Sequence, residues 1–171
     1  MQTDLAGKVV VVTGAAGGIG SAIARSFAAE GAHLVLHYRR NRRGAEKLRR
    51  ELSGTGAIAV PADLTREGEV RRLIAAAVKR FGGVDTLVAN AGSWETRDVM
   101  LPSMSLKQWR QTLDGVLTSA FLLGSAGSAH HRPDFGRGWR HGRALAVASR
   151  RSGSSHRVSP SSREFMRPIP R

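Results

Sequence analysis

A glycine-rich stretch near the start of the chain constrains the fold more than any other feature. Residues 13–20 read Thr-Gly-Ala-Ala-Gly-Gly-Ile-Gly, between an apolar run at 9–12 and a helical pattern that begins at residue 21. Gly14 can adopt the backbone angles of a tight turn, and Gly18 and Gly20 have no Cβ to keep a phosphate away. The free N–H groups at the start of the helix then face that phosphate. A glycine motif alone is often an ordinary loop, but its position between strand and helix predicts a nucleotide site.

Strand-like and helical patterns alternate along the following hundred residues. Strands are expected at residues 9–12, 33–38, 57–60 and 84–89, and helices from residue 21, at 44–52 and at 65–81. The apolar residues of the third helix recur at helical spacing, so one of its faces packs on the sheet. Strands and helices that alternate in this way form parallel sheets with right-handed crossovers. The sequence therefore predicts an α/β fold with a Rossmann-like, doubly wound parallel sheet.

The residues after the second strand bear on the choice of nucleotide. Arg39 and Arg40 follow this strand, and no acidic residue occurs between Gly31 and Glu46. At this place in a doubly wound nucleotide fold, an acid accepts hydrogen bonds from the adenosine ribose, whereas arginine pairs with a 2′-phosphate. We expect Arg39, and with less support Arg40, to favour NADP(H) over NAD(H). The alternative is a solvated basic turn that leads into a surface helix.

Three motifs in this order resemble those of the short-chain dehydrogenase/reductase family. They are Thr-Gly-x-x-x-Gly-Ile-Gly at 13–20, Ala-Asp-Leu at 62–64 and Ala-Asn-Ala-Gly at 89–92. The resemblance covers residues 7 to about 124. It implies an oxidoreductase that transfers a hydride between a nicotinamide cofactor and the carbonyl or secondary alcohol of a small substrate.

The resemblance also implies a role for each motif in holding the cofactor. The residues expected along the pyrophosphate are Gly14, Gly18, Ile19 and Gly20. Asp63 and Leu64 are expected at the adenine, and Asn90, Ala91 and Gly92 beside the nicotinamide ribose. Taken singly, Asp63 is more often a cap beside a helix and Asn90 a structural tie between strands. Their joint placement favours the cofactor roles.

A further helix is expected over residues 105–121, beginning at a capping box formed by Ser105 and Gln108. Its apolar stripe consists of Leu106, Trp109, Leu113, Val116, Leu117, Ala120 and Phe121. By the resemblance this helix packs on the sheet and on a second subunit, so we expect the stripe to form core and a homo-oligomer surface. Val116 stands where the family usually has an asparagine that holds a water in the proton relay. Valine neither donates nor accepts a hydrogen bond, so the relay differs here.

The composition changes at about residue 125. Residues 1–124 are expected to form the dinucleotide-binding domain, incomplete because its later strands are missing. Residues 125–171 are rich in Arg, Ser, Gly, Pro and His and show little periodicity. Such a segment cannot bury enough apolar surface to offset its ordering entropy, so we expect an irregular basic tail. Our hypothesis is that this tail is an out-of-frame or degenerate translation of what followed.

The catalytic residues implied by the resemblance are largely missing. Residues 141–149 resemble the family's fifth strand, whose terminal serine orients the substrate carbonyl, so Ser149 is the catalytic candidate. The family also uses a tyrosine as general acid or base, followed four residues later by a lysine. The only tyrosine is Tyr38, and the expected positions fall near Ser162 and Met166. We therefore expect a truncated, catalytically impaired enzyme.

Composition limits the other classes of protein. The chain has 171 residues, a net charge of +14 and no cysteine, which excludes disulfides and thiolate metal sites and fits the cytoplasm. No apolar run reaches membrane-spanning length, and no metal site is expected, because the histidines lack a carboxylate or cysteine pattern. Ten arginines against two acids in residues 125–171 make nucleic-acid binding a weaker alternative. A dinucleotide-binding module without catalysis is the other alternative.

Overall fold

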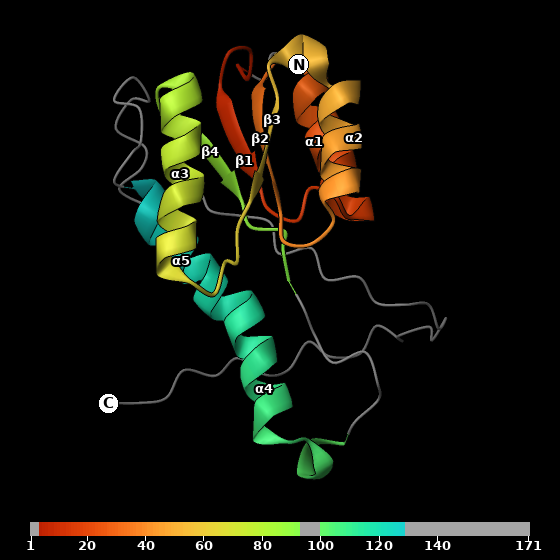
Figure 1. Ribbon diagram of the computed structural model, residues 1–171, viewed down its shortest axis with the longest axis vertical. Helices are drawn as coiled ribbons and strands as arrows, with labels where there is room; N and C mark the ends of the chain where they lie inside the picture. Colours follow the sequence, from red (N-terminus) through yellow and green to blue (C-terminus); the bar gives the residue numbers. More distant parts are fainter. Residues whose placement is uncertain (1–3, 93–99, 129–171) are drawn as a thin grey trace, which may run out of the picture.

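Four parallel strands form one sheet in the computed structural model, which describes residues 4–92 and 100–128. The strands are β1 (Val9–Val12), β2 (His33–Tyr38), β3 (Ile58–Pro61) and β4 (Thr86–Val88). Their order is β3-β2-β1-β4 (Figure 1), and Val10 of β1 lies opposite Leu34 on one side and Thr86 on the other. The order runs outward from β1 in both directions, so the predicted Rossmann-like, doubly wound fold is confirmed.

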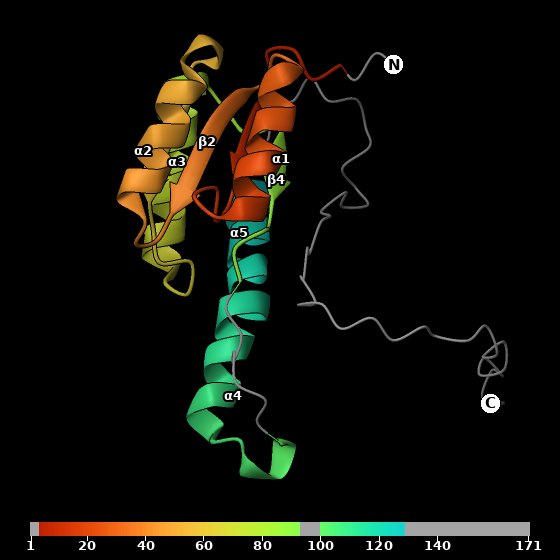
Figure 2. The same cartoon turned by 90° about the vertical axis from the view of Figure 1, so that its right-hand side faces the viewer.

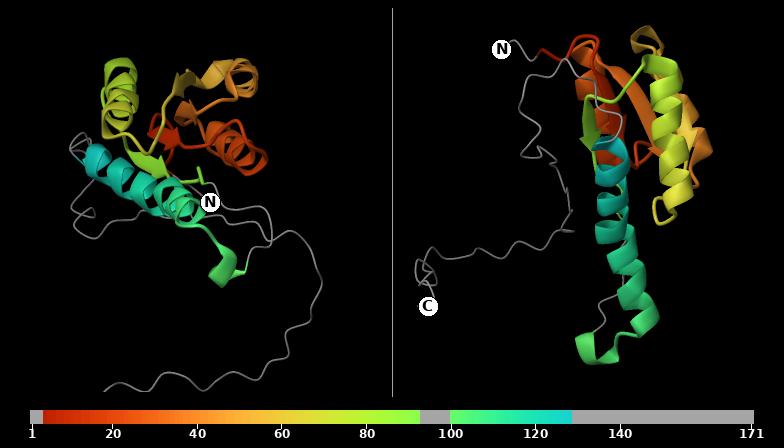
Figure 3. Two further views of the ribbon diagram at one scale, coloured as in Figure 1. Left: turned by 60° about the horizontal axis from the view of Figure 1, so that its bottom comes forward. Right: turned by 90° about the vertical axis from the view of Figure 1, so that its left-hand side faces the viewer.

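Helices cover both faces of the sheet (Figure 3). One face packs against α1 (Gly18–Ala29) and α2 (Arg42–Glu51), and the other against α3 (Glu67–Phe81) and α5 (Ser119–Ser128). The side chains of β1 alternate between the two faces. Val10 and Val12 join the core under α1, while Val9 and Val11 join the core under α3 and α5. Burial on both faces explains why the strand is an unbroken apolar run.

The helix α3 shows the amphipathic pattern expected from the sequence. Its fully buried residues are Val70, Leu73, Ile74 and Ala77. Two glutamates lie in the first turn and two basic residues in the last, as the helix dipole favours. The helix ends at Gly82, whose φ of 84° lies in the left-handed region that glycine adopts without strain. The predicted helix is thus confirmed within two residues at its start.

A buried carboxylate fixes the entry into β4. Asp85 is 6% exposed, and its Oδ2 accepts a hydrogen bond of 2.8 Å from the backbone N–H of Val9. Lys8 Nζ lies 3.9 Å from the other carboxylate oxygen. These contacts tie the start of β4 to the start of β1. The strand is shorter than the predicted 84–89, because Asp85 uses its side chain as a tie ahead of the ladder.

The helix predicted over residues 105–121 has three parts. It consists of α4 (Leu106–Leu113), a π-helical segment (Asp114–Thr118) and α5, which continues to Ser128. The predicted capping box is confirmed, because the Ser105 hydroxyl accepts from the Gln108 N–H and the Gln108 side chain accepts from the Ser105 N–H. Two short 3₁₀ turns occur at Ser53–Thr55 and Leu101–Ser103. In Figure 2, α4 projects beyond the sheet, while α5 lies against it.

Much of the apolar stripe of this helix is exposed, so only part of it is core, and the expected homo-oligomer surface stays a prediction. Its exposed members are Leu106, Trp109, Leu117 and Phe121, between 46% and 71% exposed. The buried residues of α5 are Ser119, Leu123 and Gly127, and Leu123 joins the core that contains Val9 and Val11 of β1. A π-helical turn contains an additional residue and therefore rotates the faces of the helix. A stripe counted with a uniform 3.6-residue period therefore changes face within residues 114–118, whereas Leu106 and Trp109 are exposed because α4 projects beyond the sheet (Figure 2).

Candidate functional site

The glycine-rich turn between β1 and α1 has the geometry that its sequence predicts. Gly14 has a φ of +64°, in the left-handed region, and its carbonyl accepts from the N–H of Gly17 at 3.0 Å. A Cβ at Gly20 would collide with the carbonyl oxygen of Gly14. Nothing lies within 4 Å of a Cβ built at Gly18, so this position faces open space. The turn therefore requires glycine at positions 14 and 20, and Gly18 leaves the start of α1 accessible.

The N-terminus of α1 offers hydrogen-bond donors. Gly17 precedes the helix and makes no side-chain cap, and the first turn contains no acidic side chain. The first N–H groups of an α-helix have no partner within the helix and carry a partial positive charge. This helix end can therefore bind an anionic group.

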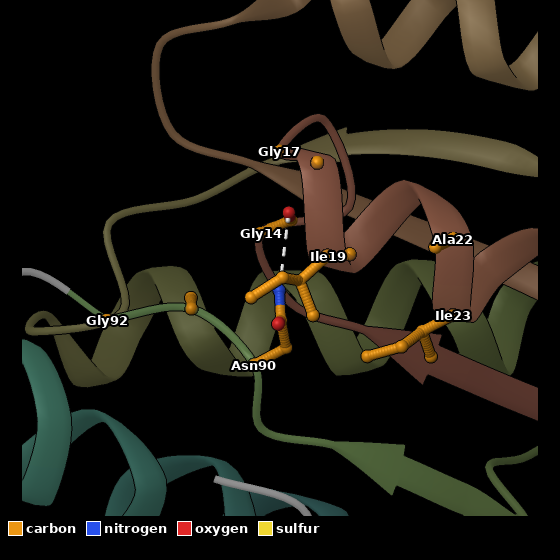
Figure 4. Close-up of a pocket in the computed structure, with 10 residues that line it drawn as sticks. Gly14, Gly17, Ile19, Ala22, Ile23, Asn90 and Gly92 are labelled. Atoms are coloured by element: carbon orange, nitrogen blue, oxygen red, sulfur yellow. Dashed lines mark hydrogen bonds between the residues drawn. The ribbon is translucent and has the colours of Figure 1, made fainter. Parts of the chain in front are cut away.

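Thr13 joins the glycine-rich turn to the loop after β4. Its hydroxyl donates to the carbonyl of Val88 at 3.0 Å and accepts from the N–H groups of Asn90 and Ala91, each at 2.9 Å. The Asn90 side chain donates to the carbonyl of Thr13 at 2.8 Å and, at 3.4 Å, to that of Gly14 (Figure 4). Asn90 is therefore a structural tie, one of the two roles considered for it. The sequence analysis assigned no role to Thr13. Its position directly before the first glycine of the motif was the signal that could have indicated this tie.

These two loops enclose a cavity of about 690 Å³ over the start of α1. Its lining contains seven of the residues that the sequence assigned to a cofactor: Gly14, Gly18, Ile19, Gly20, Asn90, Ala91 and Gly92. Figure 4 shows Ile19, from α1, and Asn90, from the loop after β4, both beside Gly14. Motifs separated by about seventy residues in the sequence are thus brought to one cavity.

A second cavity, of about 250 Å³, shares Gly14, Ala91 and Gly92 with the first. Its remaining lining residues are His37, Arg39, Ala62, Asp63, Leu64, Thr65, Gly115 and Ser119. The two cavities adjoin, so together they extend from the loop after β4 to the ends of β2 and β3. Arg39, Asp63 and Leu64 are thus brought together around one cavity. Arg40 is exposed and is absent from the described lining of both cavities.

Asp63 and Arg39 form an ion pair beside the second cavity. Arg39 Nη2 lies 3.1 Å from Asp63 Oδ2, and Asp63 Oδ1 accepts from the hydroxyl of Thr65 at 2.8 Å and from its N–H at 3.1 Å. Burial acts to raise the pKa of Asp63, but the hydrogen bonds from Thr65 and the charges of Arg39 and Arg66 outweigh it. The pKa is therefore below its usual value, and the carboxylate is charged at neutral pH. This charge holds the Arg39 guanidinium at the mouth of the second cavity.

His37 is a functional-site residue that sequence reasoning missed. It lies in β2 and lines the second cavity, yet it is only 2% exposed. Its Nδ1 accepts from the N–H of Gly14 at 3.1 Å, and its Nε2 lies 2.9 Å from the carbonyl oxygen of Ala62. The signal for it was a polar residue among the apolar ones of a buried strand, two residues before Arg39.

The residues expected to catalyse the reaction are only partly described. Ser149 lies outside the described residues, as do Ser162 and Met166. Val116, at the predicted relay position, lies beside the site: a Cβ added to Gly92 would be 3.7 Å from its Cγ2. Tyr38 is 9% exposed within β2. Within residues 4–92 and 100–128, no three His, Cys, Asp or Glu side chains are grouped to hold a metal ion.

No helix of residues 4–92 and 100–128 is both long enough and apolar enough to cross a bilayer.

Comparison with known proteins identifies the family. The sequence model of the short chain dehydrogenase family matches residues 8–156, a range that includes Ser149. A 3beta-hydroxysteroid dehydrogenase 1 of Eggerthella lenta is 43% identical over 125 residues, which are 71% of this chain and 46% of that protein. A 3-oxoacyl-[acyl-carrier-protein] reductase of Synechocystis is 39% identical over 127 residues, 73% of this chain and 51% of that protein. The chain thus spans about half the length of these relatives.

A solved structure matches over the same part of the chain. It is a short chain dehydrogenase from Burkholderia cenocepacia in complex with NADP, 32% identical, with a TM-score of 0.69. The match covers 74% of this chain and 52% of that one. The chain belongs to the short-chain dehydrogenase/reductase family of oxidoreductases.

Proposed function

We propose that this chain binds a nicotinamide dinucleotide, with NADP(H) preferred to NAD(H), in the two adjoining cavities. The observation that carries the proposal is the continuous lining by residues of the three family motifs, with an arginine at the far end. The glycine-rich turn fits a pyrophosphate, since the space beside Gly18 is open and the start of α1 offers N–H groups without a side-chain cap. The second cavity, between Leu64 and Arg39, fits the adenosine half. The Burkholderia cenocepacia protein in complex with NADP supports the same assignment.

Arg39 is the residue that we propose selects the phosphorylated cofactor. Its guanidinium is already at the second cavity and half-exposed, with one nitrogen paired to Asp63. A guanidinium has five N–H donors, so it can retain Asp63 and bind a 2′-phosphate as well. Arg40 has no place in the lining and serves as a matched control, one residue away with the same charge.

The test is a titration of the full chain with NADP⁺ and with NAD⁺ by isothermal calorimetry. Replacing Arg39 by alanine is expected to weaken NADP⁺ binding by about 10- to 100-fold, because a charge-assisted hydrogen bond contributes about 1.5–3 kcal/mol. NAD⁺ binding should change little, and Arg40→Ala should change neither. A wild-type chain that binds neither nucleotide would contradict the proposed function, and equal losses in both arginine variants would contradict the role of Arg39.

We propose further that the whole protein's ancestral reaction is hydride transfer between the nicotinamide and a small carbonyl or secondary alcohol. Bound at this site, the nicotinamide would supply or accept the hydride, and the protein would orient it through the loop after β4. The chain offers no tyrosine and lysine pair at the positions that the family uses, and Val116 replaces the relay asparagine. We therefore propose that this chain binds the cofactor with impaired turnover. Cofactor binding without measurable oxidation of NADPH by simple ketones is the expected result.

The origin of the basic segment is a separate proposal. We place the departure from the family within residues 125–171, a segment that the family model matches as far as residue 156. An out-of-frame translation accounts for the loss of the tyrosine and lysine. Sequencing the gene and translating all three frames from codon 120 onward tests this. A frame that continues into Tyr-x-x-x-Lys would support it, and the lack of such a frame would contradict it.

The exposed face of α4 and α5 supports self-association. Leu106, Trp109, Leu117 and Phe121 form an apolar surface that no described residue covers. We propose that a second copy of the chain packs on this surface. Sedimentation of the wild type against a Phe121→Ser variant is the test, since the variant should shift a dimer towards monomer without unfolding it.

A further inference from the structure

His37 connects two walls of the candidate site through both nitrogens of its ring. Its Nδ1 is 3.1 Å from the backbone nitrogen of Gly14, and its Nε2 is 2.9 Å from the carbonyl oxygen of Ala62. Its own carbonyl accepts from the N–H of Ala15 at 3.0 Å. One residue therefore contacts the first two amides of the glycine-rich turn and the segment that leads into Asp63.

These contacts define the protonation of the ring. The N–H of Gly14 is a donor, so Nδ1 must be unprotonated in order to accept from it. The carbonyl of Ala62 is an acceptor, so Nε2 must carry the proton. Only the neutral Nε2–H tautomer satisfies both contacts. In a charged imidazolium, Nδ1–H would oppose the N–H of Gly14, and that contact would become repulsive.

The surroundings of the ring favour the neutral form. Burial lowers the pKa of His37, against opposing effects of the Ala62 hydrogen bond and the Asp63 carboxylate. Among the described residues that line the second cavity, the charged groups are Asp63, whose carboxylate favours the charged ring, and Arg39, which is paired with Asp63. The glycine-rich turn and β1 carry no titratable side chain, and Gly115 and Ser119 supply none from the helix.

We propose that His37 is a positioning residue of the dinucleotide site, whose neutral ring holds the Gly14 turn to the Ala62–Asp63 segment. The inference rests on the proposed function, because what it positions is the pair of cavities assigned to the cofactor. Gly14 belongs to the lining of both cavities, so a rotation of its peptide alters the pyrophosphate and adenosine halves together. Protonation of His37 therefore weakens nucleotide binding, and the affinity falls as the pH is lowered below the ordinary histidine range.

The test compares the pH dependence of binding in three forms of the full chain. The probe is NAD⁺, whose missing 2′-phosphate removes a group that titrates in the same range. In His37→Asn, the amide oxygen can accept from the N–H of Gly14 and does not titrate. His37→Leu has no acceptor. Each is titrated from about pH 8 down to about pH 5.5.

At the upper pH we expect His37→Asn to bind within about threefold of the wild type and His37→Leu to bind about tenfold more weakly, as for one lost hydrogen bond. Towards acid the wild type should lose affinity relative to His37→Asn, by less than about tenfold at pH 5.5 because the pKa of His37 lies below its ordinary value. A purely structural role would reduce affinity in the variants without changing the shape of the profile. Parallel profiles of the wild type and His37→Asn would overturn the inference and leave the proposed function intact.

A second measurement requires no variant. A long-range ¹H–¹⁵N spectrum of the wild type at neutral pH should show His37 with an unprotonated Nδ1 and a protonated Nε2. The opposite tautomer, or a charged ring, would overturn the inference even if the variants fail to fold. A wild-type chain that binds no nucleotide at about pH 8 refutes the proposed function, and the inference with it.

Discussion

The apolar side chains of the strand that leads into the glycine-rich turn are buried, whereas many of those on the helix pair α4–α5 are exposed. In the first region, all four valines of β1 are fully buried between two layers of helices. In the second, Leu117 is 62% and Phe121 71% exposed. Their hydrophobicity is similar, and the difference lies in whether the described residues supply a covering element. An apolar pattern identifies a surface that needs a partner, but the partner must be found independently.

The largest difference is expected between two neighbouring residues of α5. Leu123→Ala removes a side chain that is 1% exposed and packs under α3, so it should lower the free energy of unfolding by about 2–5 kcal/mol. Phe121→Ala removes a larger but exposed side chain and should change the unfolding of the monomer by about 0.5 kcal/mol or less. Urea unfolding of both variants at a concentration below self-association measures this. Equal losses of unfolding free energy in the two variants would contradict the burial of Leu123 and the exposure of Phe121.

At the start of α1, substitution of Gly20 and of Gly18 by alanine should have different effects on stability. Gly20→Ala places a Cβ against the carbonyl of Gly14, a backbone atom that cannot move aside, and should cost about 1–3 kcal/mol and abolish nucleotide binding. Gly18→Ala meets nothing within 4 Å and should leave the stability unchanged or raise it slightly. Thermal unfolding and calorimetric titration distinguish the two. A stable Gly20→Ala chain that binds nucleotide would contradict the close packing of this turn.

The turn region, but not α4–α5, should make stability depend on pH near neutrality. His37 has a lowered pKa in the folded chain, so between that pKa and its ordinary value of about 6.5 only the unfolded chain binds the proton. Stability is therefore complete above about pH 6.5 and decreases as the pH falls below it. From about pH 7.5 to 5.5 the urea midpoint of the wild type should fall relative to that of His37→Asn, which does not titrate at this position, so that the difference between them narrows or changes sign. A constant difference would argue against titration of His37.

The smallest effect is expected on the exposed surface of α3. Glu67 and Arg71 are four residues apart and form an ion pair through side chains that are 61% and 73% exposed. Such pairs contribute about 0.3–0.5 kcal/mol, and the charge of Glu67 in the first turn of α3 adds a similar amount through the helix dipole, so Glu67→Gln should lower the unfolding free energy by less than about 1 kcal/mol. The change should shrink further at high salt. A loss near that of Leu123→Ala would require a role for Glu67 beyond this pair.

Much of the fold and of the candidate site could be predicted where local pattern and tertiary environment agree. The strands at residues 9–12 and 33–38 and the three motif segments were found because periodicity and glycine chemistry are local. The role of His37 could not be predicted, because it depends on Gly14 and Ala62 lying on either side of its ring. The buried face of α5 could not be predicted, because nothing in residues 114–118 marks a π-helical turn, which changes which face of the following helix is buried.

The hydrogen bonds of Thr13 also have a consequence for the order of folding. Thr13 directly follows β1, but the backbone groups that hydrogen-bond to its hydroxyl belong to residues 88–91, about 75 positions later in the sequence. On a ribosome, β1, β2 and β3 emerge and can pair before this partner loop has been synthesised. The second cavity is also lined by Gly115 and Ser119, so ligand can stabilise the nascent chain fully only after residue 119 has left the exit tunnel.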